Sequence, residues 1–170
     1  MGEDENKKRE RRHQEDLERL RGFRPIDDTF MRGLFKENIP LAELVLRIIT
    51  GKPDLVLLKC ETQADMKRVT GARSVCLDAY ATDSTGKKYD IEVQRSDNGA
   101  DPHRARYHSS MLDIEYRDNS DIGRLMHDFN CTNASDMYFD LLAEKTRYLK
   151  ENPKGVNEMC KVMEDLRNES

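Results

Sequence analysis

The sequence predicts an α+β fold in which three antiparallel strands are flanked by helices. Apolar residues recur at helical spacing over 30–49 and again over 135–166. Three short runs with strand character lie between these stretches, and 77–94 has the composition of a β-hairpin with a central turn. Strands and helices that are segregated along the chain are typical of α+β domains.

The composition is that of one domain of ordinary size with many charged residues. The chain has 170 residues, 36% hydrophobic and 36% charged, with a net charge of −4. This net charge provides no general attraction to nucleic acid, so any DNA contact requires a local basic patch.

The four cysteines show neither C-x-x-C pairing nor zinc-ligand spacing, so we expect reduced thiols. Neither a secretory signal nor a long apolar run occurs, so we expect a cytoplasmic protein with no membrane contact.

Residues 1–22 are expected to form a charged helix or tail. Seven basic and seven acidic side chains occur in 1–21, with almost no apolar ones. Such a segment has little to bury, which favours a solvated helix or tail. A nucleic-acid-binding arm is the alternative, through Lys7-Lys8-Arg9 and Arg11-Arg12.

Two helices and a strand are predicted before the hairpin. Asp27 and Asp28, which follow Pro25, are favoured as the cap and the acidic first turn of a helix. A second helix is expected over 40–50, where a proline precedes the apolar stripe and a glycine ends it. The apolar run 55–58 then predicts a buried strand.

The turn of the hairpin predicts a specific register. Residues 84–86 fit a three-residue loop in which Gly86 takes the left-handed position. Asp83 and Lys87 then close the loop as a pair. Counting outward from this pair places Asp78 opposite Glu92.

Opposed residues in antiparallel strands have Cβ atoms about 4.5–5.5 Å apart, so ionised Asp78 and Glu92 would repel each other. A shared proton, a nearby cationic side chain or a bound cation would offset the repulsion. Alternation along the strand places Asp90 and Gln94 on the same face as Glu92. A divalent-metal site is therefore one interpretation. A solvent-facing strand, or a one-residue slip of the loop, is the other.

Three more helices are predicted after the hairpin. The first begins at Asp101-Pro102 and includes the apolar residues at 111–114. The second and third span 135–150 and 156–166, separated by the breakers Pro153 and Gly155.

Five phrases of the sequence match one known family in order. They are FRPIDDTFM at 23–31, GARSVCLD at 71–78, YDIEVQ at 89–94, RARYH at 104–108 and LMHDF at 125–129. The chain thereby resembles the PD-(D/E)XK nuclease family transposases, which are related to the recombination-promoting nucleases. The resemblance implies a restriction-endonuclease-like core at 23–118, followed by a C-terminal helical segment at 119–170.

The resemblance also implies a DNA endonuclease of a mobile element, dependent on Mg²⁺ or Mn²⁺ and active in DNA recombination. Asp78 and Glu92 take the positions of the metal ligands, with the backbone carbonyl of Val93 as a further ligand. Gln94 stands where the wider superfamily most often carries a catalytic lysine. Asp27 matches the acidic residue of the first helix.

Arg104 and Tyr107 lie in the predicted helix after the hairpin, where similar proteins carry basic and aromatic residues that face the site. Arg104 and Arg106 would then contact DNA phosphates. One departure concerns the stretch after about Asp113, where relatives carry further strands that this chain lacks. This internal deletion would leave an exposed sheet edge. A catalytically inactive, truncated remnant that binds DNA or protein is therefore the alternative function.

Overall fold

The structure of the chain is a computed structural model that describes residues 2–62, 79–94, 111–113 and 119–169. These ranges hold both helices and a sheet, so the predicted α+β class is confirmed. The helices are α1 (Gly2–Gly22), α2 (Asp28–Phe35), α3 (Ile39–Thr50), α5 (Asp121–Phe129), α6 (Asp140–Glu151) and α7 (Pro153–Glu169), with a short 3-10 helix η1 (Ala134–Asp136). The strands are β1 (Leu57–Thr62), β2 (Ala79–Asp83), β3 (Lys88–Gln94) and β4 (Met111–Asp113).

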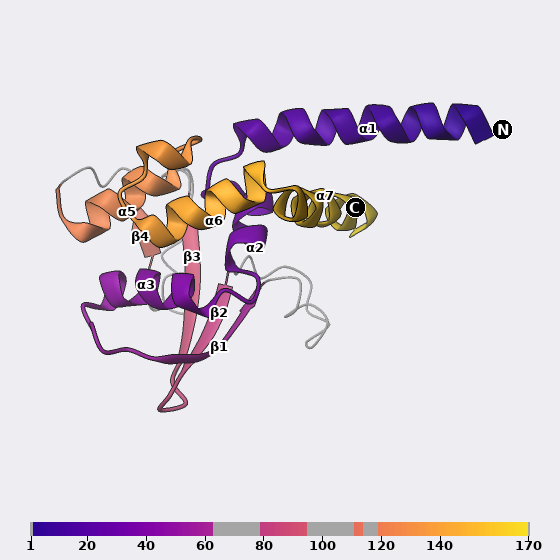
Figure 1. Cartoon of the computed structure of the whole chain (residues 1–170). Coiled ribbons are helices and arrows are strands. Elements are labelled where there is room, and N and C mark those ends of the chain that lie inside the picture. Colours follow the sequence, from indigo (N-terminus) through magenta and orange to yellow (C-terminus); the bar gives the residue numbers. More distant parts are fainter. Residues whose placement is uncertain (1, 63–78, 95–110, 114–118, 170) are drawn as a thin grey trace.

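Strands β1, β2 and β3 form the predicted antiparallel meander, and β4 extends the sheet beyond it (Figure 1). β4 runs parallel to β3, with Met111 beside Glu92 and Asp113 beside Gln94. The helix predicted to include 111–114 is therefore wrong at 111–113. A short apolar run fits either element, and here pairing with β3 gives a strand. The predicted start of that helix, at 101–110, lies outside the described residues.

Strand β1 begins later than the apolar run 55–58 predicts. Leu57 is buried, whereas Leu58 is 64% exposed, so the run is not buried throughout. The register shifts between Leu57 and Lys59, which marks a β-bulge at this end of the strand. The carboxylate of Glu43 on α3 accepts the Leu57 N–H at 2.9 Å and so ties the strand to the helix.

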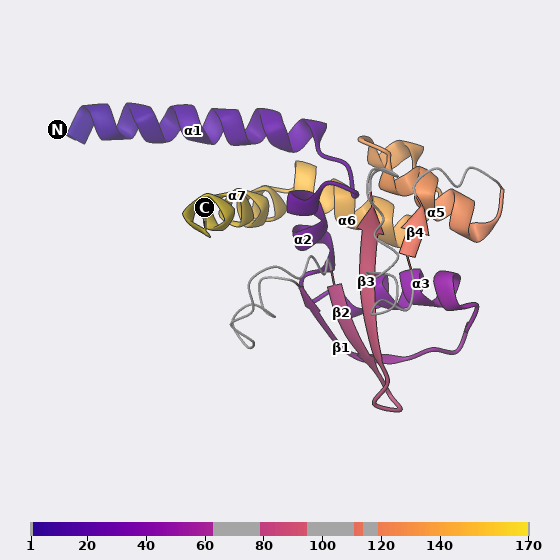
Figure 2. The same ribbon diagram turned by 180° about the vertical axis from the view of Figure 1, so that it is seen from behind.

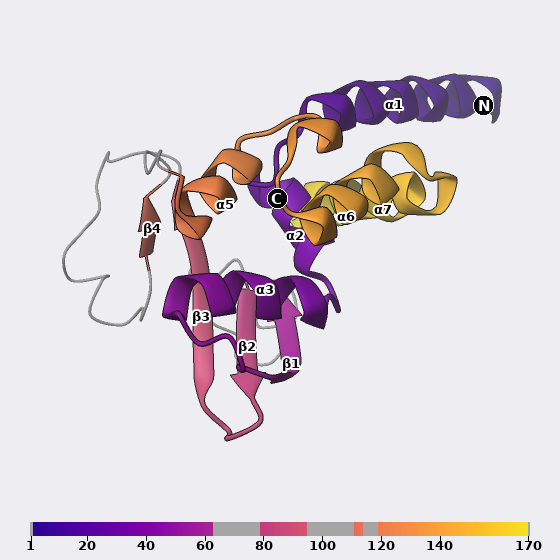
Figure 3. The same cartoon turned by 60° about the vertical axis from the view of Figure 1, so that its left-hand side comes forward.

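Helix α3 lies across one face of the sheet, and α2, α6 and α7 pack together beside it (Figures 1 and 3). One hydrophobic core joins the sheet to both groups of helices. Its fully buried side chains include Phe30, Phe35, Leu41, Leu46, Ile91, Leu125, Met126 and Phe129. The backbone N–H of Ile26 donates to the carbonyl of Phe129 at 3.0 Å, which fixes α5 next to the start of α2.

Helix α1 projects from this body, and most of its length lies away from the core (Figure 2). Of its residues, only Asp16 and Leu20 are buried. The charged segment is thus a helix. None of the helices in the described ranges is both long enough and apolar enough to cross a bilayer.

The C-terminal helices differ from the prediction in two places. Helix α5 lies inside the helical segment expected at 119–170, but no separate helix was predicted for its residues, although Ser120 caps it by accepting the Gly123 N–H at 3.1 Å. The helix predicted over 135–150 is wrong at its start, because the chain forms η1 there and α6 begins only at Asp140. Asn133 accepts the Ser135 N–H at 3.1 Å, a local turn contact that competes with an earlier helix start.

Candidate functional site

The loop between β2 and β3 is organised by one carboxylate. Asp83 Oδ1 accepts the Thr85 hydroxyl at 2.6 Å and the backbone N–H groups of Thr85 and Lys87, both at 2.9 Å. Tyr89 donates its hydroxyl to Asp83 Oδ2 at 3.0 Å. The hydrogen bond from the Thr85 side chain is the largest of the effects that lower the pKa of Asp83 to about 2. Gly86 has a φ of +84°, as the predicted loop requires.

The predicted register of the hairpin is confirmed over its described part. The Asp83 N–H donates to the carbonyl of Lys87 at 2.9 Å, and Tyr80 pairs with Asp90 and Ala79 with Ile91. The apolar face of β3 is confirmed for Tyr89 and Ile91, which are buried against the core. The described part of the ladder ends at the Ala79–Ile91 pair.

The backbone of Glu92, Val93 and Gln94 belongs to β3, with β4 on one side of these residues. β2 pairs with β3 up to Ile91. The side chains at positions 92–94 lie outside what the structure describes, as do Asp78, Arg104 and Arg106. Of the proposed metal ligands, the structure therefore describes the backbone of Glu92 and Val93 in β3 and leaves Asp78 undescribed.

Asp27 occupies the N-cap position of α2, and its side chain makes no cap hydrogen bond to that helix. Asp27 Oδ2 instead accepts the backbone N–H of Arg24 at 2.7 Å, and Oδ1 lies 3.7 Å from a guanidinium nitrogen of Arg24. Its own carbonyl accepts the Met31 N–H at 2.8 Å. Asp27 thus stands at the start of α2, but its side chain does not supply the cap that the sequence favours, and the catalytic role implied by the resemblance stays a prediction.

A second cluster of possible ligand residues lies at the end of α5. It consists of His127, Asp128 and Cys131, whose ligand atoms all lie within 4.8 Å of one another. His127 Nδ1 is 3.1 Å from Asp128 Oδ1 and 3.6 Å from Cys131 Sγ. The sequence predicted no role for these residues, although His127 and Asp128 belong to the phrase LMHDF. The signal that could have found them is the spacing H-D-x-x-C at a helix end, where four residues of separation bring His127 and Cys131 together.

Asp128 orients this cluster from inside the protein. Its side chain is fully buried. Its two oxygens accept the Tyr138 N–H at 2.9 and 3.0 Å, and Oδ2 also accepts the Phe139 N–H at 2.9 Å. These bonds tie the end of α5 to the start of α6. The exposed ring of Tyr138 contacts His127, with the two ring centroids 4.8 Å apart.

The Cys131 thiol is not activated as a nucleophile. Burial, together with the carboxylates of Asp128 and Asp136, raises its pKa to about 11. A nucleophilic cysteine requires a lowered pKa, because the thiolate is the reactive form. Cys131 is therefore protonated near neutral pH, and either covalent catalysis or metal binding by its sulfur requires loss of this proton.

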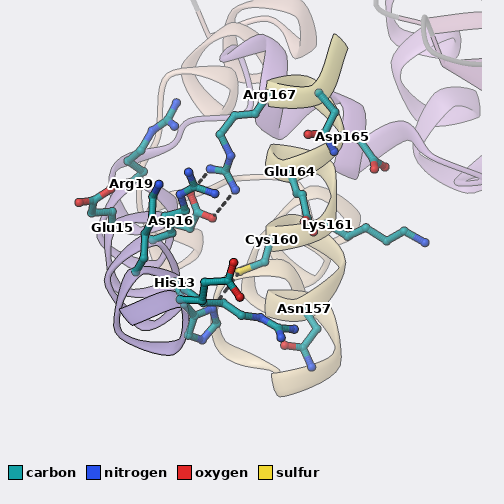
Figure 4. Close-up of a pocket in the computed structure, with 15 residues that line it drawn as sticks. His13, Glu15, Asp16, Arg19, Asn157, Cys160, Lys161, Glu164, Asp165 and Arg167 are labelled. Carbon is teal, nitrogen blue, oxygen red and sulfur yellow. Dashed lines mark hydrogen bonds and ion pairs between the residues drawn. The ribbon is translucent and has the colours of Figure 1, made fainter. Parts of the chain in front are cut away.

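A groove of about 1180 Å³ lies between α1 and α7 (Figure 4). Basic and acidic side chains alternate around it. The basic ones are Lys8, Arg9, Arg12, Arg19, Lys161 and Arg167, and the acidic ones are Glu5, Glu15, Asp16, Glu164 and Asp165. Because the charges nearly balance, the groove does not provide the single-sign basic surface that a phosphodiester backbone requires. This argues against α1 as a nucleic-acid-binding arm through this groove.

Comparison with protein-family models, with curated proteins and with solved structures finds no match for this chain.

Proposed function

We propose that the chain is a DNA endonuclease of the transposase and recombination-promoting type, with a restriction-endonuclease-like core and a site for Mg²⁺ or Mn²⁺. Asp78 and Glu92 are the carboxylate ligands. DNA is the partner, and the reaction is hydrolysis of a phosphodiester bond. The observation that carries the proposal is the register of the β2–β3 hairpin.

The register supports the pairing of the two carboxylates. Asp83 and Lys87 form a hydrogen-bonded pair, and such pairs alternate with non-hydrogen-bonded pairs along an antiparallel ladder. The Ala79–Ile91 pair is then a hydrogen-bonded one. The proposal extends the ladder by one pair, to position 78 and Glu92. That pair is of the non-hydrogen-bonded type, in which Cα atoms approach to about 4.5 Å and side chains are closest.

The donor set fits a hard divalent cation. Mg²⁺ prefers oxygen ligands and retains several waters, so two carboxylates and the carbonyl of Val93 are sufficient protein ligands. Bound there, the ion would lower the pKa of a water and stabilise charge on the scissile phosphate. Gln94 has no positive charge, so its amide would orient the attacking water or a phosphate oxygen by hydrogen bonding. Arg104 and Arg106 would neutralise neighbouring phosphates.

The position of β3 inside the sheet also supports an intact site. The internal deletion inferred from the sequence would leave an exposed edge in the sheet. β4 instead pairs with Glu92, Val93 and Gln94 from the side opposite β2, over the residues proposed as ligands. The described pairing with β2 ends at Ile91, so β4 is the described neighbour of residues 92–94. A site built on paired strands is held more precisely than one built on loops.

Conversion of supercoiled plasmid to nicked or linear forms with Mg²⁺ or Mn²⁺ tests the proposal. We expect Asp78→Asn and Glu92→Gln to reduce the rate by about 100-fold or more, because loss of a ligand costs more than loss of a group that orients one. Asp54→Asn, which removes an exposed carboxylate before β1, is the control and should retain the rate. Absence of cleavage by the folded wild-type protein would favour the inactive remnant, and unchanged cleavage by both ligand variants would refute the site.

A further inference from the structure

We propose that His127, Asp128 and Cys131 form a second metal site, which binds Zn²⁺ rather than Mg²⁺. The site joins the end of α5 to the segment that leads into α6. It does not depend on the proposed nuclease function, because it uses other residues and another class of ion.

The distances between the ligand atoms are close to those of a tetrahedral zinc site. With Zn–N and Zn–O bonds of about 2.1 Å and Zn–S bonds of about 2.3 Å, the edges of a tetrahedron measure about 3.4–3.6 Å. The His127–Asp128 edge is 3.1 Å and the His127–Cys131 edge is 3.6 Å. The third edge is no longer than 4.8 Å. Small rotations of His127, whose side chain is 46% exposed, and of Cys131 would complete the geometry.

The charge of Asp128 favours a cation at this place. A buried carboxylate is costly unless it is paired, and the charged partner that the described residues give Asp128 is His127, which is cationic only when protonated. Backbone N–H groups of Tyr138 and Phe139 hold the carboxylate in position. A carboxylate has about four lone-pair sites, so these bonds leave Asp128 able to bind an ion.

The donor set selects the type of ion. One imidazole nitrogen, one thiolate and one carboxylate suit Zn²⁺, whereas Mg²⁺ prefers oxygen ligands alone. On binding, the Cys131 S–H bond is replaced by a sulfur–metal bond and the proton passes to solvent. In the metal-bound form the proton of neutral His127 would reside on Nε2, so that Nδ1 is free to coordinate. Three protein ligands leave the fourth position to water or to a substrate group.

Without an ion, hydrogen bonds alone account for the same contacts. His127 Nδ1–H would donate to Asp128, and the Cys131 thiol donates to the carbonyl of His127 at 3.4 Å. Closeness of the three side chains is therefore no test, and the experiment must detect bonds between these side chains and a metal ion. Co²⁺ is the probe, because thiolate ligation gives a charge-transfer absorption and tetrahedral coordination gives intense visible bands.

The full chain, freed of metal with a chelator, is titrated with Co²⁺. We expect saturation at one equivalent with thiolate-to-cobalt charge transfer, reversal by Zn²⁺, and no reversal by excess Mg²⁺. His127→Ala should weaken binding at least tenfold, and Cys131→Ser should remove the charge-transfer band. Cys160→Ser is the matched control, since this cysteine is also partly exposed but lies outside the cluster. It should bind as the wild type does.

Thermal unfolding provides a second measurement. Zn²⁺ should raise the Tm of the wild type and of Cys160→Ser, and should leave the Tm of His127→Ala unchanged, because an ion stabilises only a fold that binds it. The His127 side chain is about half exposed, so its variant tests the site even where Cys131→Ser folds poorly. The proposal is overturned if the folded wild type shows no saturable cobalt spectrum, or if the charge-transfer band survives in folded Cys131→Ser.

Discussion

Arg167 donates two hydrogen bonds to the carboxylate of Asp16, Nη1 to Oδ1 at 2.6 Å and Nη2 to Oδ2 at 2.9 Å. This two-pronged pair joins α1 to α7, two helices that are far apart in the sequence (Figure 4). The Asp16 side chain is only 7% exposed, whereas that of Arg167 is 42% exposed. Leu20 is the one buried apolar residue of α1, so the ion pair is a main attachment of this helix.

Removal of the pair should loosen α1. Because Arg167 is partly exposed, we expect a coupling energy of about 1–2 kcal/mol, between that of surface and buried pairs. The measurement is a double-mutant cycle of Asp16→Asn and Arg167→Met, followed by urea unfolding. The pair Lys59–Glu61 on β1, whose side chains are 64% and 25% exposed, is the control and should couple by less than about 1 kcal/mol. Equal coupling in the two pairs would contradict the role assigned to Asp16.

Gly33 allows α2 to approach α7 closely, and alanine there should destabilise the fold. A Cβ atom at this position would lie in steric conflict with Met159 Sδ, and 3.5 Å from Leu149 Cδ1. Both side chains are fully buried, so we expect Gly33→Ala to cost about 1–3 kcal/mol in unfolding free energy. Gly22→Ala is the control, because no atom lies within 4 Å of its added Cβ. A neutral effect of Gly33→Ala would show that Met159 repacks without strain.

The hairpin was predictable because its determinants are local. Gly86 and the neighbouring loop residues select the turn, and the turn sets the register of every pair that follows. Strand β4 was not predictable in the same way. Met111–Asp113 is too short to carry a period of its own, and it becomes a strand only by pairing with β3, which lies 17 or more positions earlier.

The cluster at the end of α5 was not predictable from the sequence for a different reason. Sequence spacing alone suggests that His127 and Cys131 are neighbours only if a helix is already expected there, and α5 was not expected as a separate helix. The burial of Asp128 depends on the N–H groups of Tyr138 and Phe139, which arrive through η1 and the turn after it. Its carboxylate therefore becomes part of a candidate site only through tertiary structure.

Lys150 should contribute strongly to stability through three backbone acceptors. Its ammonium donates to the carbonyls of Arg21 at 3.2 Å, Phe23 at 2.5 Å and Thr132 at 2.7 Å. Replacement with methionine keeps the aliphatic chain but leaves these carbonyls without their donor, so Lys150→Met should cost about 2 kcal/mol by chemical unfolding. Lys145→Met is the matched control on the same helix, because within the described part of the chain the Lys145 ammonium has a ring contact to Tyr148 in place of backbone acceptors. It should cost less than about 1 kcal/mol.

Acid should weaken the hairpin through Asp83. Hydrogen bonds, first that of the Thr85 hydroxyl, lower the pKa of Asp83 to about 2 in the folded state from an ordinary value of 3.8. A carboxyl with a lowered folded-state pKa binds fewer protons when folded, so its stabilisation is present above about pH 4 and is lost as the pH falls towards 2.

Chemical unfolding of the wild type and of Asp83→Asn over this range tests the prediction. The variant should be less stable at pH 6 and should lose less stability on acidification, whereas Asp54→Asn, which removes an exposed carboxylate, should follow the wild type. Parallel curves for the wild type and Asp83→Asn would refute a role for this carboxylate in acid sensitivity.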